Sequence, residues 1–351
     1  MRKLGIAVAI GAIVASGAIL TVPSSAQAAA KTPPRVPGMA CVRAGKTVTT
    51  AKYGRLRCAR LDGRKIWRYP QLNGTKTLRV GGMTRSYVLH VPAVMNPNVP
   101  LVISLHGDPS NPAEQQAITG YNATSNANGF IVAYPAGTHE GSWADGRGTT
   151  DADKYGVNDV QFMRALIASL KSKYGVNSHR VYVSGYSNGA YMAERLACQI
   201  PGKIAAITAV SGTLPTDLPC APARAISVLQ IHGTADPFVP YNGGMVSDTN
   251  GSSPVVGTPT MVERWRSMNG CPAPSTSSLP DNGDGTSVSI SSAVGCRAGS
   301  AVVFYTVNNG GHTWPGGTGG PPFEQPSSFG KTTTAFSASD TSWAFFNSHV
   351  R

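Results

Sequence analysis

The chain has 351 residues, of which 41% are apolar and 13% charged, and its formal net charge is +13. The large apolar share excludes an intrinsically disordered chain, and the small charged share excludes a coiled coil. The charge is concentrated, because residues 31–75 hold eleven Lys or Arg against one Asp, whereas residues 76–351 hold 17 against 16 Asp or Glu. The basicity therefore belongs to an N-terminal appendage of an almost neutral protein.

The first thirty residues have the pattern of a secretory signal peptide. Arg2 and Lys3 give a positive start, an apolar stretch covers residues 4–20, and Ala26-Gln27-Ala28 supplies a small-x-small cleavage site. The apolar stretch is short for a transmembrane helix, and no later stretch is long enough to be one. We therefore expect residues 1–30 to be a signal peptide, the rest to be secreted and extracellular, and no membrane span.

Six cysteines in an exported chain are expected to pair as disulfides, because the compartment is oxidising. A metal site is the alternative, but none of the cysteines has C-x-x-C spacing. Each short loop closed by a disulfide would stabilise the fold by about 3 kcal/mol. Proximity in the sequence favours three pairs, Cys41–Cys58, Cys198–Cys220 and Cys271–Cys296.

Residues 31–74 are predicted to form a linker and a small basic module. Residues 31–38 are rich in proline, and the following stretch alternates basic with apolar residues around Cys41, Cys58 and Trp67. This pattern indicates a β-rich module held by one disulfide. One interpretation is attachment to an anionic surface, such as cell-wall polymer or acidic plant polysaccharide. The alternative is a solvated basic tail that aids solubility, and nucleic-acid binding is not expected of an exported protein.

From residue 75 to residue 351 the chain alternates strands with helices after an initial hairpin. Such alternation predicts an α/β domain with a mostly parallel sheet. Residues 281–285 hint at a calcium loop, but Ser292 occupies the position where an acid is expected, so a plain turn is predicted. We expect strands at 77–80, 86–91, 100–107, 129–135, 181–184, 204–210, 226–232 and 301–307, and helices at 113–126, 157–174, 188–198, 258–268 and 339–348.

One turn carries a catalytic motif. Gly185-Tyr186-Ser187-Asn188-Gly189 lies between a predicted strand and a predicted helix, and it has the G-x-S-x-G pattern of a nucleophile elbow. Such a turn exposes the serine hydroxyl and directs the helix N-terminus toward any negative charge that forms beside it. The alternative is a glycine-rich turn that holds an ordinary serine.

The partners of Ser187 are predicted from their positions after strands. In open α/β sheets the reactive groups lie beyond the carboxyl ends of the strands. Asp236 follows the strand at 226–232, and His312 follows the strand at 301–307, which gives the order Ser, Asp, His of an α/β-hydrolase. After Ser187 the other histidines are His232, which ends a strand and is interpreted as structural, and His349, which lies at the C-terminus.

The expected roles follow from the chemistry of acyl transfer. His312 would take the proton of the Ser187 hydroxyl, and Asp236 would orient and stabilise the imidazole. The oxyanion of the tetrahedral intermediate needs preorganised donors. We expect these to be the backbone N–H groups of Asn188 and of Asp108 in the loop after Leu105-His-Gly. This chemistry needs no cofactor and no metal.

Several motifs resemble a known family. The stretches that carry the resemblance are Leu105-His-Gly, Ala133-Tyr-Pro-Ala-Gly-Thr, Ser142-Trp-Ala-Asp-Gly-Arg-Gly, Val157-Asn-Asp-Val, Gly185-Tyr-Ser-Asn-Gly, Ile231-His-Gly-Thr-Ala-Asp-Pro and Gly310-Gly-His-Thr-Trp-Pro-Gly. They resemble the secreted α/β-hydrolase esterases grouped with polyhydroxybutyrate depolymerases and feruloyl esterases, over residues 76–349.

The resemblance implies an α/β-hydrolase fold with helices on both faces of the sheet and the triad Ser187, Asp236 and His312. It implies that Trp143 and Trp314 lie near the mouth of the site and contact substrate, although packing of loop against loop is the alternative for both. Asp159 is expected to support the site from the start of its helix. The chain departs from the family at Tyr186, where methionine is frequent, and at Asp108-Pro109-Ser110, so both places are expected to shape the substrate pocket.

We therefore expect a secreted serine esterase that acts through an acyl-enzyme. Its substrates would be polyester oligomers of the polyhydroxyalkanoate type, or feruloyl or acetyl esters of plant polysaccharide. One alternative is a noncatalytic surface- or polysaccharide-binding protein with an inactive hydrolase domain, although the elbow, the acid and the histidine are intact. A peptidase on the same fold is the other, although the chain has no stretch that would form a lid or propeller.

Overall fold

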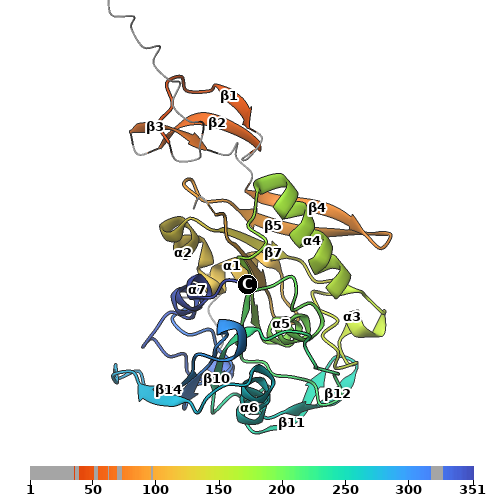
Figure 1. Cartoon of the computed structure of the whole chain (residues 1–351). Helices are drawn as coiled ribbons and strands as arrows, with labels where there is room; N and C mark the ends of the chain where they lie inside the picture. Colours follow the sequence, from red (N-terminus) through yellow and green to blue (C-terminus); the bar gives the residue numbers. More distant parts are fainter. Residues whose placement is uncertain are drawn as a thin grey trace, which may run out of the picture. The chain divides into compact units, whose positions relative to one another are not determined.

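The computed structural model describes residues 35, 39–50, 54–61, 63–68, 73–95, 98–317 and 327–351 (Figure 1). The expected signal peptide and most of the proline-rich linker lie outside the described residues. No helix within these ranges is long and apolar enough to cross a membrane.

The basic module is a three-stranded antiparallel sheet of β1 (Thr47–Thr50), β2 (Gly54–Leu61) and β3 (Arg64–Arg68). One disulfide, Cys41–Cys58, ties the segment before β1 to β2. The side chains of Leu56, Cys58 and Trp67 are buried beside it. A disulfide and a few apolar side chains thus stabilise a sheet whose other residues are mostly polar.

A ten-stranded sheet forms the centre of the remaining chain. Its middle strands β7, β6, β8, β9, β10 and β15 run parallel, and antiparallel strands flank them at both edges. The order across the sheet is β13 (Ser275–Ser278), β14 (Ser287–Ala293), β15 (Val302–Asn308), β10 (Ser227–Gly233), β9 (Ala206–Val210), β8 (Val181–Tyr186), β6 (Leu101–Leu105), β7 (Ile131–Pro135), β5 (Met83–His90) and β4 (Gly74–Val80).

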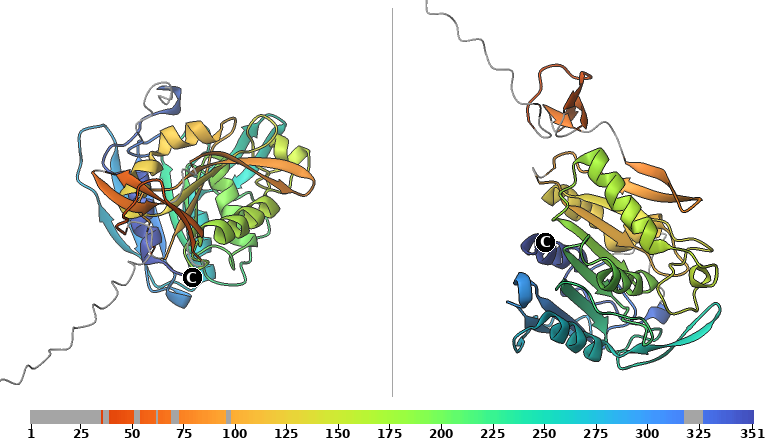
Figure 2. Two further views of the ribbon diagram at one scale, coloured as in Figure 1. Left: turned by 90° about the horizontal axis from the view of Figure 1, so that it is seen from above. Right: turned by 45° about the vertical axis from the view of Figure 1, so that its right-hand side comes forward.

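Helices cover both faces of this sheet, as the two views in Figure 2 show. Alternate residues of each parallel strand point to opposite faces, so a strand covered on both sides is mostly apolar along its length. All five residues of β6 are buried, for example. The helices are α1 (Pro112–Thr119), α2 (Tyr121–Asn128), α3 (Asp151–Lys154), α4 (Asp159–Tyr174), α5 (Asn188–Gln199), α6 (Thr258–Asn269) and α7 (Ala338–Ser348).

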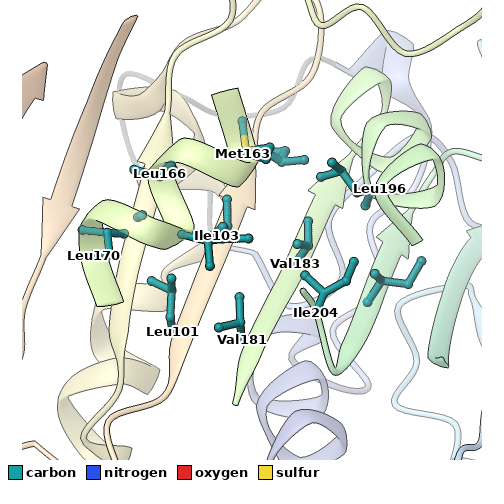
Figure 3. Close-up of a cluster of buried hydrophobic side chains, with 14 of the residues drawn as sticks. Leu101, Ile103, Met163, Leu166, Leu170, Val181, Val183, Leu196 and Ile204 are labelled. Atoms are coloured by element: carbon teal, nitrogen blue, oxygen red, sulfur yellow. The ribbon is translucent and has the colours of Figure 1, made fainter. Parts of the chain in front are cut away.

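The two faces have separate cores. Residues of α4, α5 and α6 pack with Leu101, Ile103 and Val183 on one face, and residues of α2 and α7 pack with Val102 and Tyr182 on the other. Figure 3 shows the first core, where Met163, Leu166 and Leu170 of α4 lie over β6 and Leu196 of α5 lies beside β8. The predicted α/β architecture with a mostly parallel sheet is confirmed.

The structure differs from the elements that the sequence predicts. The single helix expected at 113–126 is two helices, because Gly120 adopts a left-handed conformation (φ 61°) that ends α1. The short helix α3 was not expected. Two hairpins were also missed, β13–β14 and the separate ribbon β11 (Gly243–Asp248) with β12 (Gly251–Val256). These strands are rich in serine and glycine, and apart from a short alternation around Val288 and Ile290 of β14 they lack the apolar pattern that predicts a strand.

Two further disulfides lie in this part of the chain: Cys198–Cys220 joins the last turn of α5 to the chain beyond it, and Cys271–Cys296 follows α6. With Cys41–Cys58 they are the three pairs that proximity in the sequence favours. Short 3₁₀ helices cover Arg297–Gly299 and Ser327–Phe329.

The pairing of α5 with α6 generates a prediction about stability. Glu194 is fully buried, Oε2 accepts a hydrogen bond from Trp265 Nε1 at 2.7 Å, and Oε1 has no partner among the described residues. Burial raises the pKa of Glu194 from 4.5 to about 8, and the Trp265 bond opposes this only in part. The folded state therefore keeps a proton that the unfolded state loses above about pH 4.5, so stability falls as pH rises toward about 8.

We expect Glu194→Gln, which keeps the shape of the side chain and cannot ionise, to remove this loss. The melting temperature of the variant should exceed that of the wild type at about pH 8, and the two should converge near about pH 4, as measured by circular dichroism. A difference in melting temperature that is the same at both pH values would contradict a protonated Glu194 in the folded state.

Candidate active site

The turn between β8 and α5 holds Ser187 in a strained conformation. Its φ is 55° and its ψ is −121°, outside the regions that L-residues prefer. A Cβ on Gly185 would collide with the carbonyl oxygen of Gly189, and a Cβ on Gly189 would collide with that of Leu105. Glycine is needed at both positions because backbone meets backbone there. The turn leaves Ser187 partly exposed at the end of the strand.

Asp236 and His312 lie side by side beyond two neighbouring strands. β10 and β15 are adjacent and parallel, so the turns that follow them meet at one edge of the sheet. His312 Nδ1 donates to Asp236 Oδ2 at 2.8 Å. Asp236 Oδ1 accepts from the backbone N–H groups of Phe238 and Val239 at 2.9 and 2.8 Å. With its proton on Nδ1, a neutral His312 ring has Nε2 free to accept a hydrogen bond.

Ser187 and His312 line the same cavity. Both residues are among those that the structure describes, and no hydrogen bond joins their side chains there. Bonds of this kind are often long before substrate binds and tighten in the complex. The structure thus brings the three residues of the predicted triad to one edge of the sheet, with the acid–histidine pair already formed.

A second histidine contacts the same carboxylate. His232 Nε2 lies 3.5 Å from Asp236 Oδ2 and donates to Val239 O at 3.0 Å, while Thr258 Oγ1 lies 3.2 Å from Nδ1. Burial lowers the pKa of His232, so the ring is neutral at neutral pH. The sequence interpretation of His232 as a structural residue agrees with these contacts.

Asp236 is held in its ionised form. Burial by itself would raise its pKa, but the hydrogen bond from His312, together with the attraction of both histidines, outweighs burial and lowers the pKa below the ordinary value. The ionised carboxylate is thus available to accept the hydrogen bond from His312 Nδ1.

A cavity of about 710 Å³ opens over Ser187 and His312. Its lining combines apolar and aromatic residues with charged ones, of which Asp108 and Arg147 are two. The apolar and aromatic lining residues are Ile118, Tyr186, Pro237, Phe238, Val239, Pro240, Met245, Val246 and Phe329. Because the ribbon β11–β12 was not expected, Met245 and Val246 were not predicted to line the site. Phe238 directly follows Asp236-Pro237, and its place in the chain could have suggested a role at the site.

The expected oxyanion donors flank Ser187. Asn188 begins α5, so its backbone N–H is one of the groups at the helix N-terminus without a partner inside the helix. Gly107 lies close by, because a Cβ built on it would lie 3.3 Å from Ser187 Cβ, and Asp108 is the next residue in the cavity wall. Asn188 and Asp108 therefore both lie in the cavity wall close to Ser187, as expected of two donors.

Buried polar contacts fix the residue after the nucleophile. The Asn188 side chain accepts from Trp143 N at 2.8 Å and donates from Nδ2 to Asp145 Oδ2 at 2.6 Å. Asp145 in turn pairs with Arg147 at 2.8 Å, and Arg147 pairs with Asp248 of β11 at 3.0 Å. Asp145 and Arg147 belong to a motif that the sequence showed, but their roles follow only from these contacts.

Asp159, at the start of α4, supports the same loop. It pairs with buried Arg85 at 2.7 Å, and its Oδ2 accepts from Ala144 N at 2.8 Å. Its contact with the loop that holds Trp143 fits the support expected of it.

The two loop tryptophans do not reach the cavity. Trp143 and Trp314 are both 0% exposed, and neither is among the lining residues. Trp143 Nε1 donates to His106 O at 3.0 Å, and Trp314 Nε1 donates to Ser339 Oγ at 3.3 Å. Their positions thus favour the alternative, packing of loop against loop, over the expected contact with substrate. Tyr186 does line the cavity, and its hydroxyl donates to His312 O at 2.6 Å.

Within the described residues no group of three or more His, Cys, Asp or Glu side chains is arranged to hold a metal ion. The loop that hinted at calcium binding is a turn. Asp284 accepts hydrogen bonds from the backbone and hydroxyl groups of Thr286 and Thr334, so its oxygens are taken by the protein itself.

Comparisons with known proteins identify the family of the chain. The Phospholipase/Carboxylesterase family matches residues 91–250. NocK of Nocardia uniformis subsp. tsuyamanensis, whose name assigns it provisionally to the esterases, is 33% identical over 80% of this chain and 85% of its own. Feruloyl esterase B of Piromyces equi is 30% identical over 61% of this chain and 39% of its own.

Among solved structures, the acetyl xylan esterase of Aspergillus awamori superposes with a TM-score of 0.53 and 16% identity, over 78% of this chain and 99% of that one. At this identity the match supports the fold alone. The chain therefore belongs to the α/β-hydrolase family of carboxylic ester hydrolases in which feruloyl esterases and poly(3-hydroxyalkanoate) depolymerases are grouped.

Proposed function

We propose that this esterase cleaves its substrate through an acyl-enzyme formed on Ser187, with His312 as the general base and Asp236 as the residue that orients it. The observation that carries the proposal is the 2.8 Å hydrogen bond from His312 Nδ1 to Asp236 Oδ2, made at the wall of the cavity that Ser187 lines. The bond leaves Nε2 as the basic nitrogen of His312.

In the first half of the reaction Ser187 Oγ attacks the ester carbonyl carbon while His312 Nε2 takes the hydroxyl proton. The tetrahedral intermediate collapses, the C–O bond to the alcohol breaks, and His312 returns the proton to the leaving oxygen. In the second half a water molecule loses its proton to Nε2 and attacks the acyl-enzyme, which releases the acid and restores Ser187.

The negative charge of both intermediates would be held by the backbone N–H groups of Asn188 and Asp108. Loss of one such donor typically costs about 3–4 kcal/mol of transition-state stabilisation. The contacts of the Asn188 side chain with Trp143 and Asp145 support this role, because they fix the backbone at the start of α5.

We propose feruloyl or acetyl esters of plant polysaccharide, or hydroxyalkanoate oligomers, as substrates. Relatives named as feruloyl esterases, an acetylxylan esterase and a poly(3-hydroxyalkanoate) depolymerase support these classes. The cavity offers Phe238, Phe329 and Tyr186 to an aromatic acyl group, and its charged lining residues, such as Asp108 and Arg147, offer polar groups to the hydroxyl groups of a carbohydrate. Tyr186, rather than Trp143 or Trp314, is the predicted substrate-binding aromatic residue whose position supports that role.

We also propose that the protein is exported and acts outside the cell. The three disulfides support this, because such bonds persist in oxidising compartments. Residues 31–74 are proposed to act as a module separate in function from the catalytic domain at 75–351. This is supported by their three-stranded sheet, in which β1, β2 and β3 pair with no strand of the ten-stranded sheet within the described residues.

The triad generates the first prediction for catalysis. Ser187→Ala should abolish hydrolysis of p-nitrophenyl butyrate, and Asp236→Asn should lower kcat by about 10⁴-fold because it disturbs the tautomer of His312. Thermal unfolding of the Ser187→Ala variant should stay close to that of the wild type. Turnover by this variant at the wild-type rate would refute the assignment.

Asp108 generates a prediction about pH. Burial, together with repulsion from Asp248, raises its pKa to about 7 although Arg147 opposes this. Above this value the carboxylate is ionised beside the proposed oxyanion donors and disfavours the negative intermediate. We expect the ratio of wild-type to Asp108→Asn kcat/KM to fall several-fold from about pH 6 to about pH 8.5. The ratio cancels every other titration, and a constant ratio would contradict the proposal.

A panel of substrates tests the proposed acyl group. Methyl ferulate, acetylated xylan and polyhydroxybutyrate film should be compared side by side with one enzyme preparation. Because Tyr186, Phe238 and Phe329 line the cavity, we expect the highest kcat/KM on methyl ferulate and little release of soluble product from the film. Preferred hydrolysis of the film would instead favour a depolymerase.

A further inference from the structure

The basic module presents like charges opposite one another. In the register of β2 and β3, Arg57 is paired with Arg68, and Arg60 is paired with Lys65. Residues in such pairs have Cβ atoms about 5 Å apart, and like charges at this distance repel. Arg57, Arg60 and Lys65 are exposed, and Arg68 is half-buried.

The part of the protein that the structure describes supplies little to offset this repulsion. Among the described residues no carboxylate lies within ion-pair distance of these four side chains or of exposed Arg64. Lys65 Nζ donates to Val42 O at 3.2 Å, which satisfies a donor but adds no negative charge. A sheet stapled by one disulfide thus holds cations together at a cost in stability.

Two sides of the sheet carry these charges. Arg57, Arg64 and Arg68 share one face, because residues two apart on a strand point the same way and paired residues point together. The face opposite carries buried Cys58 and Trp67, with Arg60 and Lys65 at the hairpin end. Since Trp67 is only 6% exposed, its ring is not available to stack on a ligand. Any ligand of the Arg57 face must be held by charge.

We propose that this arginine face binds a carboxylate-bearing polysaccharide and keeps the enzyme on it. A polymer of uronic acids presents repeated negative charges that suit a row of fixed cations, and the nearly neutral remainder of the chain would not compete for it. The idea that this polysaccharide also carries the ester substrate rests on the proposed function. The binding of the polysaccharide to the arginine face does not depend on that function.

The test measures binding apart from catalysis. The full secreted chain carrying Ser187→Ala is titrated with polygalacturonate in about 20 mM and about 500 mM NaCl, with dextran as the neutral polymer. Added salt should abolish the binding, because it screens exposed charges beyond a few ångströms. Arg57→Glu with Arg64→Glu should weaken binding about ten-fold or more, and it should leave p-nitrophenyl butyrate kinetics unchanged when Ser187 is intact.

The matched control is Lys171→Glu with Lys173→Glu, which changes net charge equally at exposed positions of α4. It should retain affinity to within about two-fold. An equal loss in both double variants, equal binding to dextran, or binding to phosphatidylserine vesicles without binding to polygalacturonate would each overturn the proposal.

The Arg57→Glu change places a negative charge directly opposite Arg68, so the variant should melt no lower than the wild type. Because Ser187→Ala is present throughout the titration, a failure here is distinct from a failure of the proposed catalysis.

Discussion

The close approach of three backbone segments at Gly185 and Gly189 is the constraint on which the site depends. It lets β6, β8 and α5 meet without side chains between them, and it forces Ser187 into a left-handed conformation. Strain of this kind persists only when the surroundings hold it in place. Here Ser187 N donates to Val210 O of β9, and α5 is packed onto both β8 and β9. The sheet therefore supplies the free energy that keeps the serine exposed.

Buried charges arrange the rest of the site. Arg85–Asp159 and Arg147–Asp248 join distant segments, and Asp145 pairs with Arg147 inside the loop that contacts Asn188, so these ion pairs position that loop. Buried ion pairs contribute little net stability, because removing charges from water costs about as much as their attraction returns. Their effect here is one of geometry, since an unpaired partner would be costly and other arrangements of the loop are thereby disfavoured.

The chain divides its charge between two tasks. The catalytic part is close to neutral, and the charged side chains of Asp108, Glu114, Arg147 and Asp248 line its cavity. The module gathers eleven of the basic residues into a short stretch whose register sets arginine against arginine. That arrangement costs stability in an isolated sheet, and a polyanion would remove the cost. Charge thus acts on the reaction in one part and, as we propose, on attachment in the other.

The sequence by itself determined the α/β architecture and the elbow, because strand periodicity and the order of motifs are local. It also determined Asp236 and His312 as the candidate partners of Ser187, because the carboxyl ends of parallel strands meet at one edge of a sheet. The split of α1 from α2 at Gly120 depended on a single backbone conformation. The ribbon β11–β12 and its contribution to the cavity depended on pairing between segments without an apolar pattern. Only the tertiary structure decided that Trp143 and Trp314 are buried while Tyr186 and Phe238 face the cavity, since exposure of an aromatic ring is a property of packing and leaves no mark on the motif that contains it.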